Sequence, residues 1–256
     1  MTTAISGLGG VREAVLRRLR GRYNSVRYRF WVLPRDRLIY LFRFRLMGKG
    51  FSDFYGYRLD REARISAKKP IAEGYIDSGA AHLDYLKQHG LLPHHRLLDY
   101  GCGYMRSGLY LARYLEPNRY VGVDLSGERL KAARKLASQA GIDENHYTLR
   151  VVEGLSLAEI AEFRFDYVFA CAVIPHMPRD DIVAFFRNVR SLLAPGGQIL
   201  FEFTLAERYT QINIKDFFYP VAEMKAMAVA AGYVFELLDD WTCSHPSNRM
   251  VRLVPR

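Results

Sequence analysis

The chain has 256 residues, half of them hydrophobic and a quarter charged, which suits a globular protein with a sizeable core and excludes an intrinsically disordered one. Its formal net charge of +10 is unevenly distributed: residues 1–70 hold 17 Lys and Arg against 5 Asp and Glu, and residues 71–256 hold 20 against 22. We therefore predict a basic N-terminal extension, 1–70, followed by a nearly neutral domain, 71–256.

Cysteine usage and targeting signals point to the cytoplasm. Cys102, Cys171 and Cys243 stand far apart with no paired spacing, which predicts neither a disulfide framework nor a zinc site. Residues 1–10 lack the charged start and apolar run of a signal peptide. No segment holds the roughly 18 uninterrupted apolar residues that a membrane span needs.

The extension is predicted to be mainly helical over 8–47, with a basic helix at 11–22 and arginines interleaved with apolar and aromatic residues at 35–47. Such a segment suits an anionic membrane surface, nucleic acid or an acidic substrate. It is also consistent with a solvated helix face whose apolar residues turn inward. The stretch 48–59, rich in Gly and Tyr, predicts a loop.

Strands and helices are expected to alternate after this loop, beginning with a helix at 71–89. Regular alternation implies a parallel sheet with helices on both faces. The expected strands are 96–100, 119–124, 147–152, 165–171 and 197–204, and the expected helices are 106–115, 127–140, 156–162 and 179–193. A helix at 220–231 and two strand-like runs, 233–238 and 250–254, follow.

The turn after the first expected strand carries the most information. Gly101 and Gly103 lie in it, and the next strand ends on an acid, Asp124. Glycines there let a ligand approach the backbone. Arg106 occupies the place of the third glycine of a dinucleotide fingerprint, which favours another nucleotide-type ligand.

The order Asp99-x-Gly101-x-Gly103, with Asp124 ending the next strand, resembles the class I S-adenosylmethionine-dependent methyltransferases. Residues 165–170, with their leading Phe-Asp, and residues 192–200, with Ala-Pro-Gly-Gly, resemble the family's fourth strand and the turn into its fifth. The resemblance implies an α/β, Rossmann-like, seven-stranded and mostly parallel sheet with a C-terminal antiparallel hairpin. It also implies S-adenosylmethionine as cofactor, S-adenosylhomocysteine as product, and no metal.

By this resemblance, Asp124 accepts hydrogen bonds from two ribose hydroxyls and Leu125 covers one face of the adenine. Asp124 is alternatively the N-cap of the following helix, and both roles hold if Ser126 is the cap. Leu155 stands where many relatives have Asp, so the contact to the adenine amino group falls to the Leu155 backbone or to the Glu153 side chain.

The aminoacyl end of the cofactor is expected on the other side of the glycine turn. Asp99 accepts from its ammonium group or from turn amides, and Arg106 pairs with its carboxylate, unless it makes only a surface contact. Arg58 and Tyr75 are alternatives for that carboxylate. The expected cofactor-binding residues are Asp99, Gly101, Cys102, Gly103, Arg106, Asp124, Leu125, Glu153, Gly154, Leu155 and Ala170.

The loop after the fourth expected strand places His176 where relatives face the methyl group. An imidazole there is suited to take a hydroxyl proton near neutral pH, or it shapes the pocket. The Asn-Pro-Pro-Tyr, Asp-Pro-Pro-Tyr and Pro-Cys sequences are missing from this loop, which counts against amino methylation of DNA or glutamine and against attack on pyrimidine carbon. Cys171 is expected in the core.

The acceptor is expected to be a small molecule, a glycan or a lipid-linked compound, methylated at oxygen. The turn and loop are similar to bacterial methyltransferases associated with glycan assembly, and a basic extension suits a phosphorylated or lipid-linked substrate at the inner membrane face. Alternatives are an RNA methyltransferase that uses the extension and a non-catalytic binding module. The expected acceptor residues, unless they are core, are Tyr55, Tyr57, Arg58, His176 and Tyr209.

Overall fold

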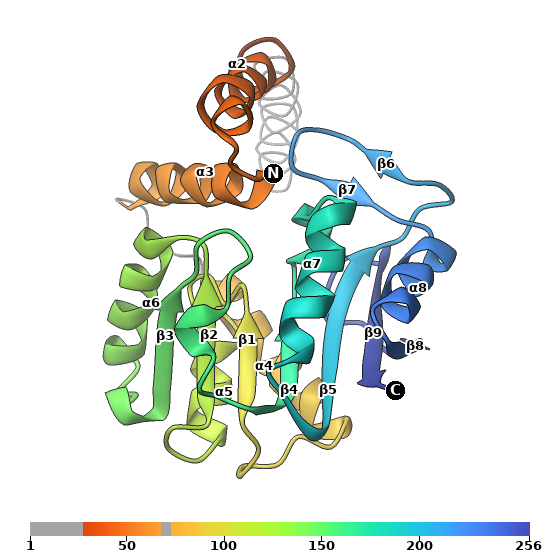
Figure 1. The fold of residues 1–256 in the computed structure, drawn as a ribbon. Coiled ribbons are helices and arrows are strands. Elements are labelled where there is room, and N and C mark those ends of the chain that lie inside the picture. Colours follow the sequence, from red (N-terminus) through yellow and green to blue (C-terminus); the bar gives the residue numbers. More distant parts are fainter. Residues whose placement is uncertain (1–27, 68–72) are drawn as a thin grey trace, which may run out of the picture. The chain divides into compact units, whose positions relative to one another are not determined.

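The computed structural model describes residues 28–67 and 73–256, and the chain divides into two compact units, Met1–Gly48 and Lys49–Arg256 (Figure 1). The described part of the first unit is helical throughout, as expected. The helix expected at 11–22 lies outside the described residues. The helical elements of this unit are η1 (Tyr28–Val32), α2 (Leu33–Ile39), η2 (Tyr40–Phe44) and η3 (Arg45–Met47).

The second unit is built on a seven-stranded sheet with the strand order β3-β2-β1-β4-β5-β9-β8. Neighbouring strands among the first five are parallel, and β9 runs antiparallel to both β5 and β8, which confirms the predicted mixed sheet and its terminal hairpin. The strands are β1 (Leu97–Tyr100), β2 (Tyr120–Asp124), β3 (Tyr147–Val151), β4 (Phe165–Ala170), β5 (Leu193–Thr204), β8 (Tyr233–Leu238) and β9 (Asn248–Pro255).

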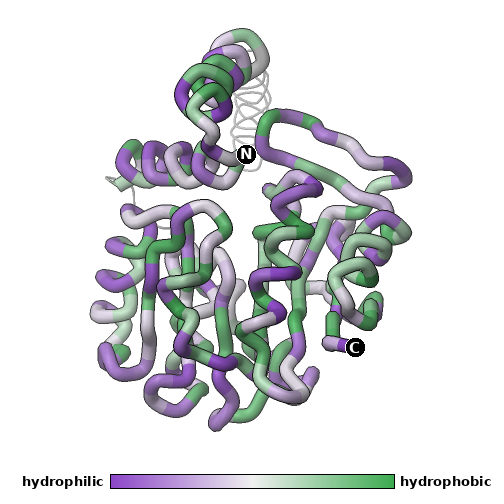
Figure 2. The backbone as a smooth tube through the Cα atoms, in the orientation of Figure 1, coloured by the Kyte–Doolittle hydropathy of each residue, from purple (hydrophilic) through white to green (hydrophobic). Residues whose placement is uncertain are grey.

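The central strands are buried because helices cover both faces of the sheet (Figure 1). Figure 2 shows hydrophobic residues along these strands, which read as continuous apolar runs, as parallel strands covered on both faces do. The larger helices are α4 (Glu73–Gln88), α5 (Gly108–Tyr114), α6 (Gly127–Gln139), α7 (Arg179–Arg190) and α8 (Val221–Ala230). Short 3-10 turns are η4 (Glu144–His146), η5 (Ala158–Ile160) and η6 (Ile174–His176).

Two local predictions were wrong. The stretch 48–59 is not a loop, because α3 (Phe51–Ser66) begins inside it. The helix expected at 156–162 is only the single turn η5, because the chain returns to the sheet at Phe165. The segment after β5 also adds a small two-stranded sheet, β6 (Thr210–Gln211) and β7 (Phe217–Phe218), for which no element was predicted.

The compact units divide after Gly48, whereas the charge distribution set the boundary at residue 70. Helix α3 holds three arginines against three acidic residues, so it is not basic like the residues before it, and it belongs to the unit that contains the sheet. Its residue Asp60 accepts hydrogen bonds from the Ser126 hydroxyl and from the Glu128 amide at the start of α6. These bonds join α3 to the segment that follows β2.

Candidate functional site

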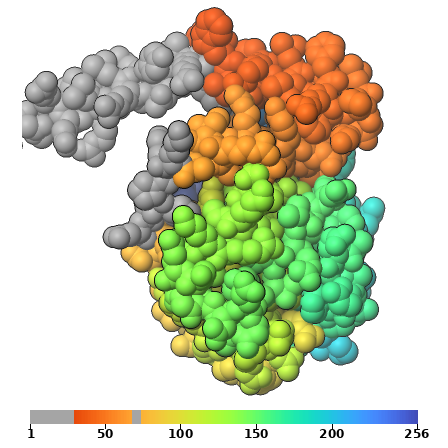
Figure 3. Space-filling model, turned by 90° about the vertical axis from the view of Figure 1, so that its left-hand side faces the viewer, coloured from red at the N-terminus to blue at the C-terminus, as the bar shows by residue number. Residues whose placement is uncertain are grey.

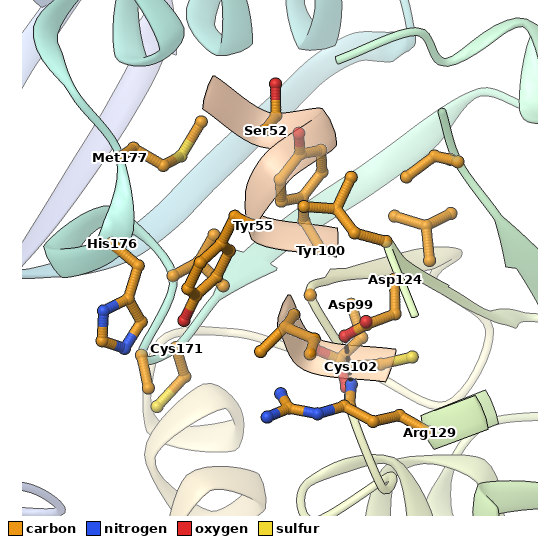
Figure 4. Close-up of a pocket in the computed structure, with 18 of the residues that line it drawn as sticks. Ser52, Tyr55, Asp99, Tyr100, Cys102, Asp124, Arg129, Cys171, His176 and Met177 are labelled. Carbon is orange, nitrogen blue, oxygen red and sulfur yellow. Dashed lines mark hydrogen bonds between the residues drawn. The ribbon is translucent and has the colours of Figure 1, made fainter. Parts of the chain in front are cut away.

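A cavity of about 280 Å³ lies at the carboxyl ends of β1, β2 and β4 (Figure 4). This is the edge at which open parallel sheets bind ligands. Helix α3, the glycine turn after β1, the loop after β4 and the segment between β6 and β7 all contribute walls. The lining residues are Phe51, Ser52, Tyr55, Leu59, Glu62, Tyr75, Asp99, Tyr100, Gly101, Cys102, Gly103, Arg106, Ser107, Val123, Asp124, Leu125, Arg129, Val152, Leu155, Cys171, Ala172, Val173, His176, Met177, Asp181 and Lys215.

The two glycines of the turn have different surroundings. Both have positive φ, +77° for Gly101 and +55° for Gly103, which a residue with a Cβ rarely adopts. A Cβ on Gly101 would lie 2.5 Å from Cγ2 of Val173, whereas a Cβ on Gly103 would meet nothing closer than 4.0 Å. Gly101 therefore permits close packing against the loop after β4, and Gly103 leaves open space beside Asp124.

Asp124 ends β2 with its carboxylate facing the cavity (Figure 4). Its Oδ2 accepts from the Gly103 amide at 2.9 Å and its Oδ1 from the Ser126 amide at 2.8 Å. Burial raises the pKa of Asp124, against the lowering effect of Arg129 and the two amides. A carboxylate oxygen can accept two hydrogen bonds, so each oxygen has capacity left for a ligand hydroxyl.

The helix cap after Asp124 is Ser126, whose hydroxyl oxygen accepts from the Arg129 amide at 3.1 Å. The alternative in which Asp124 itself caps α6 is therefore wrong. Asp124 shapes the turn through the two backbone amides that it binds, and Ser126 satisfies the helix terminus.

Asp99 lies deeper in the cavity wall, and its Oδ2 accepts from the Tyr120 hydroxyl at 2.8 Å. Burial raises the pKa of Asp99 to about 7, although the Tyr120 hydrogen bond and the Arg106 charge oppose the shift. Its observed partner is thus a buried phenol rather than the turn amides.

Arg106 lines the cavity with its guanidinium 5.0 Å from the centre of the Tyr75 ring. Its Nη2 lies 3.4 Å from the Cys171 sulfur. Burial raises the pKa of Cys171 well above its ordinary value, so that side chain remains a thiol. No carboxylate among the described residues forms an ion pair with Arg106, which leaves its charge available to an anionic ligand.

Helix α3 closes one side of the cavity, and its orange atoms lie against the green atoms of the segment after β2 in Figure 3. Gly56 permits this approach, because a Cβ there would be 3.1 Å from Cβ of Leu125. The start of the helix carries a capping signal that the sequence analysis missed. Asp53 stands three residues after Gly50, and its side chain accepts a hydrogen bond from the Gly50 amide at 2.9 Å.

The loop after β4 is hydrogen-bonded to Glu202, which is buried in β5. Oε1 of Glu202 accepts from the Ala172 amide at 2.8 Å, and Oε2 accepts from Trp241 Nε1 at 2.9 Å and from the Ser244 hydroxyl at 2.6 Å. Ala172 has a positive φ of +58°, a strained conformation that persists only where its surroundings enforce it. The position of this loop is therefore fixed by buried hydrogen bonds.

His176 lies at the end of η6, beside Tyr55 of α3, with ring centres 5.4 Å apart (Figure 4). Its Nδ1 is 3.0 Å from the Lys215 carbonyl oxygen and 3.0 Å from Oδ1 of Asp216. Both partners come from the segment between β6 and β7, about forty residues later in the chain. Sequence analysis did not select Lys215 or Asp216, since no local pattern marks them.

Eleven of the residues selected from the sequence line the cavity, and six others lie outside its lining. Tyr209, for example, lies with its ring 3.6 Å from the Arg179 guanidinium, and Arg58 forms an ion pair with Glu62 at 2.7 Å. The residues that line it are Tyr55, Tyr75, Asp99, Gly101, Cys102, Gly103, Arg106, Asp124, Leu125, Leu155 and His176. Those outside the lining are Tyr57, Arg58, Glu153, Gly154, Ala170 and Tyr209.

Comparison with known proteins points to one enzyme family. Residues 98–199 match the family model described as a methyltransferase domain. The chain is 29% identical over 152 residues to a ubiquinone biosynthesis O-methyltransferase of Xanthomonas campestris, an alignment that covers 58% of this chain and 61% of the relative. It is 31% identical over 110 residues to a probable fatty acid methyltransferase of Mycobacterium tuberculosis, covering 43% of this chain and 24% of that protein.

Solved structures share the fold at low sequence identity. Magnesium protoporphyrin IX methyltransferase from Synechocystis, solved with bound SAM, superposes with a TM-score of 0.61 at 17% identity and covers 81% of this chain and 98% of its own. The glycopeptide N-methyltransferase MtfA, solved with S-adenosylhomocysteine, gives a TM-score of 0.58 at 16% identity and covers 75% and 96%.

Proposed function

We propose that this chain, which belongs to the class I S-adenosylmethionine-dependent methyltransferase family, transfers a methyl group to an oxygen atom of a small-molecule, glycan or lipid-linked acceptor. The observation that carries the proposal is the cavity where Gly103, Asp124 and Arg106 meet at the carboxyl edge of the sheet. Together they offer space, a carboxylate and a cation to a nucleoside that is linked to methionine.

The cavity residues fit S-adenosylmethionine by their chemistry. The open space in front of Gly103 admits a ligand against the backbone, and the carboxylate of Asp124 beside it suits a pair of ribose hydroxyls. Leu125 and Leu155 offer apolar surface for a purine. Arg106 offers a cation for the carboxylate of the methionine moiety.

When bound, this cofactor supplies an electrophilic methyl group. The chain then has to align the acceptor, exclude water and take up a proton. Helix α3 covers the cavity and brings Tyr55 beside His176. His176 is the side chain that we assign to accept the proton of an acceptor hydroxyl.

The oxygen acceptor is supported by this imidazole, since a hydroxyl must lose a proton during methylation and histidine accepts protons near neutral pH. Relatives named ubiquinone biosynthesis O-methyltransferase also favour oxygen. The chain spans only 61% of that relative's length, and the acceptor is therefore part of the proposal.

Calorimetric titration of the purified chain with S-adenosylmethionine and S-adenosylhomocysteine tests the cofactor. Binding should be lost in Asp124→Ala and retained in the matched control Asp239→Ala, because Asp239 is an exposed carboxylate outside the cavity lining. NAD should not compete. Failure of the wild-type chain to bind either ligand would refute the proposed function.

The exposed surface of the first unit suggests that the protein meets its acceptor at a membrane surface. None of the helices in 28–67 and 73–256 is long and apolar enough to cross a membrane. Yet large apolar side chains in 30–47 are exposed, with Trp31 at 76% and Met47 at 70%. The exposed arginines between them include Arg37 and Arg45. We propose that this surface contacts anionic lipid, since aromatic and cationic residues together suit the bilayer interface.

Vesicle sedimentation of the full chain tests this contact. Binding should be stronger to phosphatidylcholine mixed with phosphatidylglycerol than to phosphatidylcholine alone. Replacement of Trp31 and Phe42 by Ser should weaken it, as should replacement of Arg37 and Arg45 by Gln. The control removes two exposed charges elsewhere, with Lys135→Gln and Lys225→Gln. Binding to RNA with steep salt dependence, and none to vesicles, would instead support an RNA methyltransferase.

A further inference from the structure

Two oxygen atoms lie close to one nitrogen of the His176 imidazole, a hydrogen-bonded carbonyl oxygen and an ion-paired carboxylate oxygen. Nδ1 lies 3.0 Å from the Lys215 carbonyl oxygen and 3.0 Å from Oδ1 of Asp216. A carbonyl oxygen and a carboxylate oxygen accept hydrogen bonds and cannot donate them. The neutral ring must therefore carry its proton on Nδ1, and Nε2 keeps the lone pair.

This tautomer is the one that a general base at the cavity requires. His176 lines the cavity, and its Nδ1 is occupied by the segment between β6 and β7. A proton acceptor needs an unprotonated ring nitrogen, so only Nε2 is available for that role. The hydrogen bond on the other nitrogen fixes which one is protonated.

The carboxylate of Asp216 is itself held in place. The Asn213 side-chain amide donates to its Oδ2, and the Lys215 ammonium donates to its Oδ1 at 2.7 Å. Burial alone would raise the pKa of Asp216, but the hydrogen bonds from His176, Lys215 and Asn213 outweigh it and hold the pKa well below its ordinary value. Asp216 is therefore ionised throughout the neutral range.

We infer that Asp216 is a positioning residue that holds His176 with its proton on Nδ1, so that Nε2 receives the proton of the acceptor hydroxyl. This inference rests on the proposed function. The hydroxyl proton moves to Nε2, the freed oxygen electron pair forms the new C–O bond, and the electron pair of the broken C–S bond stays on sulfur. The resulting imidazolium is stabilised by the Asp216 carboxylate and later gives its proton to water.

Three ionisable side chains lie around the His176 ring. Asp216 and Lys215 approach from the segment between β6 and β7, and Tyr55 approaches from α3. Burial raises the pKa of Tyr55 far above neutrality, so it remains a neutral phenol. Asp216 is the anion that directly contacts the ring, and its removal is the sharpest perturbation.

The test is the tautomer of His176, read by two-dimensional proton–nitrogen spectra of the full chain labelled with 15N-histidine, at pH 8 and with S-adenosylhomocysteine added. His176→Gln identifies the signal. The wild-type ring should carry its proton on Nδ1. Asp216→Asn offers an amide that can donate to Nδ1, and the ratio of the Nδ1-protonated to the Nε2-protonated form should fall about tenfold or more, as expected for loss of a hydrogen bond to a charged group.

Two further variants separate a positioning role from a structural one. Asp216→Glu keeps a carboxylate and should retain the wild-type tautomer, and Asp180→Asn makes the same chemical change at an exposed position and should leave it unaltered. A wild-type ring protonated on Nε2, or a tautomer ratio unchanged in a folded Asp216→Asn, would overturn the inference. If Asp216→Asn does not fold, the wild-type and Asp216→Glu spectra decide alone.

Two separate measurements distinguish a failure of the proposed function from a failure of this inference. Calorimetry with S-adenosylhomocysteine reports on the cofactor site, and the imidazole spectrum reports on the pair formed by His176 and Asp216. A chain that binds the ligand but carries the proton on Nε2 would retain the proposed function and lose this inference. A chain that shows the Nδ1 proton but binds neither ligand would lose the proposed function.

Discussion

The substitution Gly103→Ala separates the two roles of the glycine turn, a left-handed backbone and an open cavity. Gly103 has a φ of +55°, and an added Cβ meets no atom closer than 4.0 Å. The methyl group therefore causes no clash in the folded chain. An alanine in the left-handed region costs about 1–2 kcal/mol, and the free energy of unfolding should fall by that amount.

Gly103→Ala should also weaken ligand binding, because the added methyl group enters the cavity. The new methyl group would occupy cavity space beside the Asp124 carboxylate, where the proposed ribose hydroxyls have to lie. Overpacking typically costs about 1–3 kcal/mol, and each 1.4 kcal/mol is about a tenfold change in affinity. We expect calorimetry with S-adenosylhomocysteine to show a dissociation constant at least about tenfold higher than that of the wild-type chain.

Gly141→Ala provides a matched control. Gly141 also has a positive φ, +68°, a Cβ there meets nothing within 4 Å, and the residue follows α6 outside the cavity lining. Its variant should lose about the same free energy of unfolding in urea, about 1–2 kcal/mol, and keep wild-type affinity. Equal affinity in the Gly103→Ala variant, or equal loss in both variants, would refute the assignment of Gly103 to the ligand site.

Three further outcomes follow from packing and charge. Gly79→Ala in α4 places a Cβ 1.9 Å from the Arg106 carbonyl oxygen and should lower the free energy of unfolding by about 2–3 kcal/mol. The control Gly74→Ala, in the same helix, has open space around the added Cβ and should not lower it. Equal melting temperatures of the two variants would contradict this. Burial raises the pKa of Asp99 to about 7, above its unfolded value of about 4, so its contribution to stability is present below about pH 4 and is lost as the pH rises through about 7. Asp99→Asn should flatten that part of the pH dependence in urea unfolding at pH 5 and pH 8, and parallel slopes would count against it. Asp60→Ala removes two hydrogen bonds between α3 and the start of α6 and should weaken S-adenosylhomocysteine binding about three- to tenfold, with unchanged affinity as the contrary result.

Local sequence patterns predicted most of the fold because the sheet is built from short-range signals. The inner parallel strands β1, β2 and β4 are buried and mostly apolar, and each is followed by a turn or a helix. The glycine turn and Asp124 were located for the same reason, since a strand, a turn and a helix N-terminus lie within about thirty residues of each other. The proposed cofactor side of the cavity could consequently be predicted from one sequence.

Helix α3 was missed because composition was given more weight than periodicity. Its glycine and tyrosines resemble a loop, yet Phe51, Phe54, Leu59 and Ala63 recur at helical spacing and are buried. Gly56, one of the glycines in the stretch predicted as a loop, is required where α3 meets Leu125. A glycine inside a helical pattern can thus mark close packing rather than a break.

The proposed acceptor side of the cavity depends on contacts between residues that are distant in the sequence. Asp216 meets His176 only because the segment between β6 and β7 folds back over the loop after β4. Neither residue's immediate sequence indicates the other. The same long-range packing leaves Tyr209 under Arg179 instead of in the cavity lining.

The residues around His176 differ from those of the glycine turn in whether the family model covers them. The family model covers residues 98–199, which include the glycine turn, Asp124 and His176. Tyr55, Lys215 and Asp216 lie outside that range and build the wall around His176. We therefore expect the shared segment to bind the cofactor and the segments around it to determine the acceptor. Substitutions in α3 and between β6 and β7 should accordingly alter acceptor choice while leaving affinity for S-adenosylhomocysteine nearly unchanged, provided that they spare the contacts of α3 with Leu125 and Ser126.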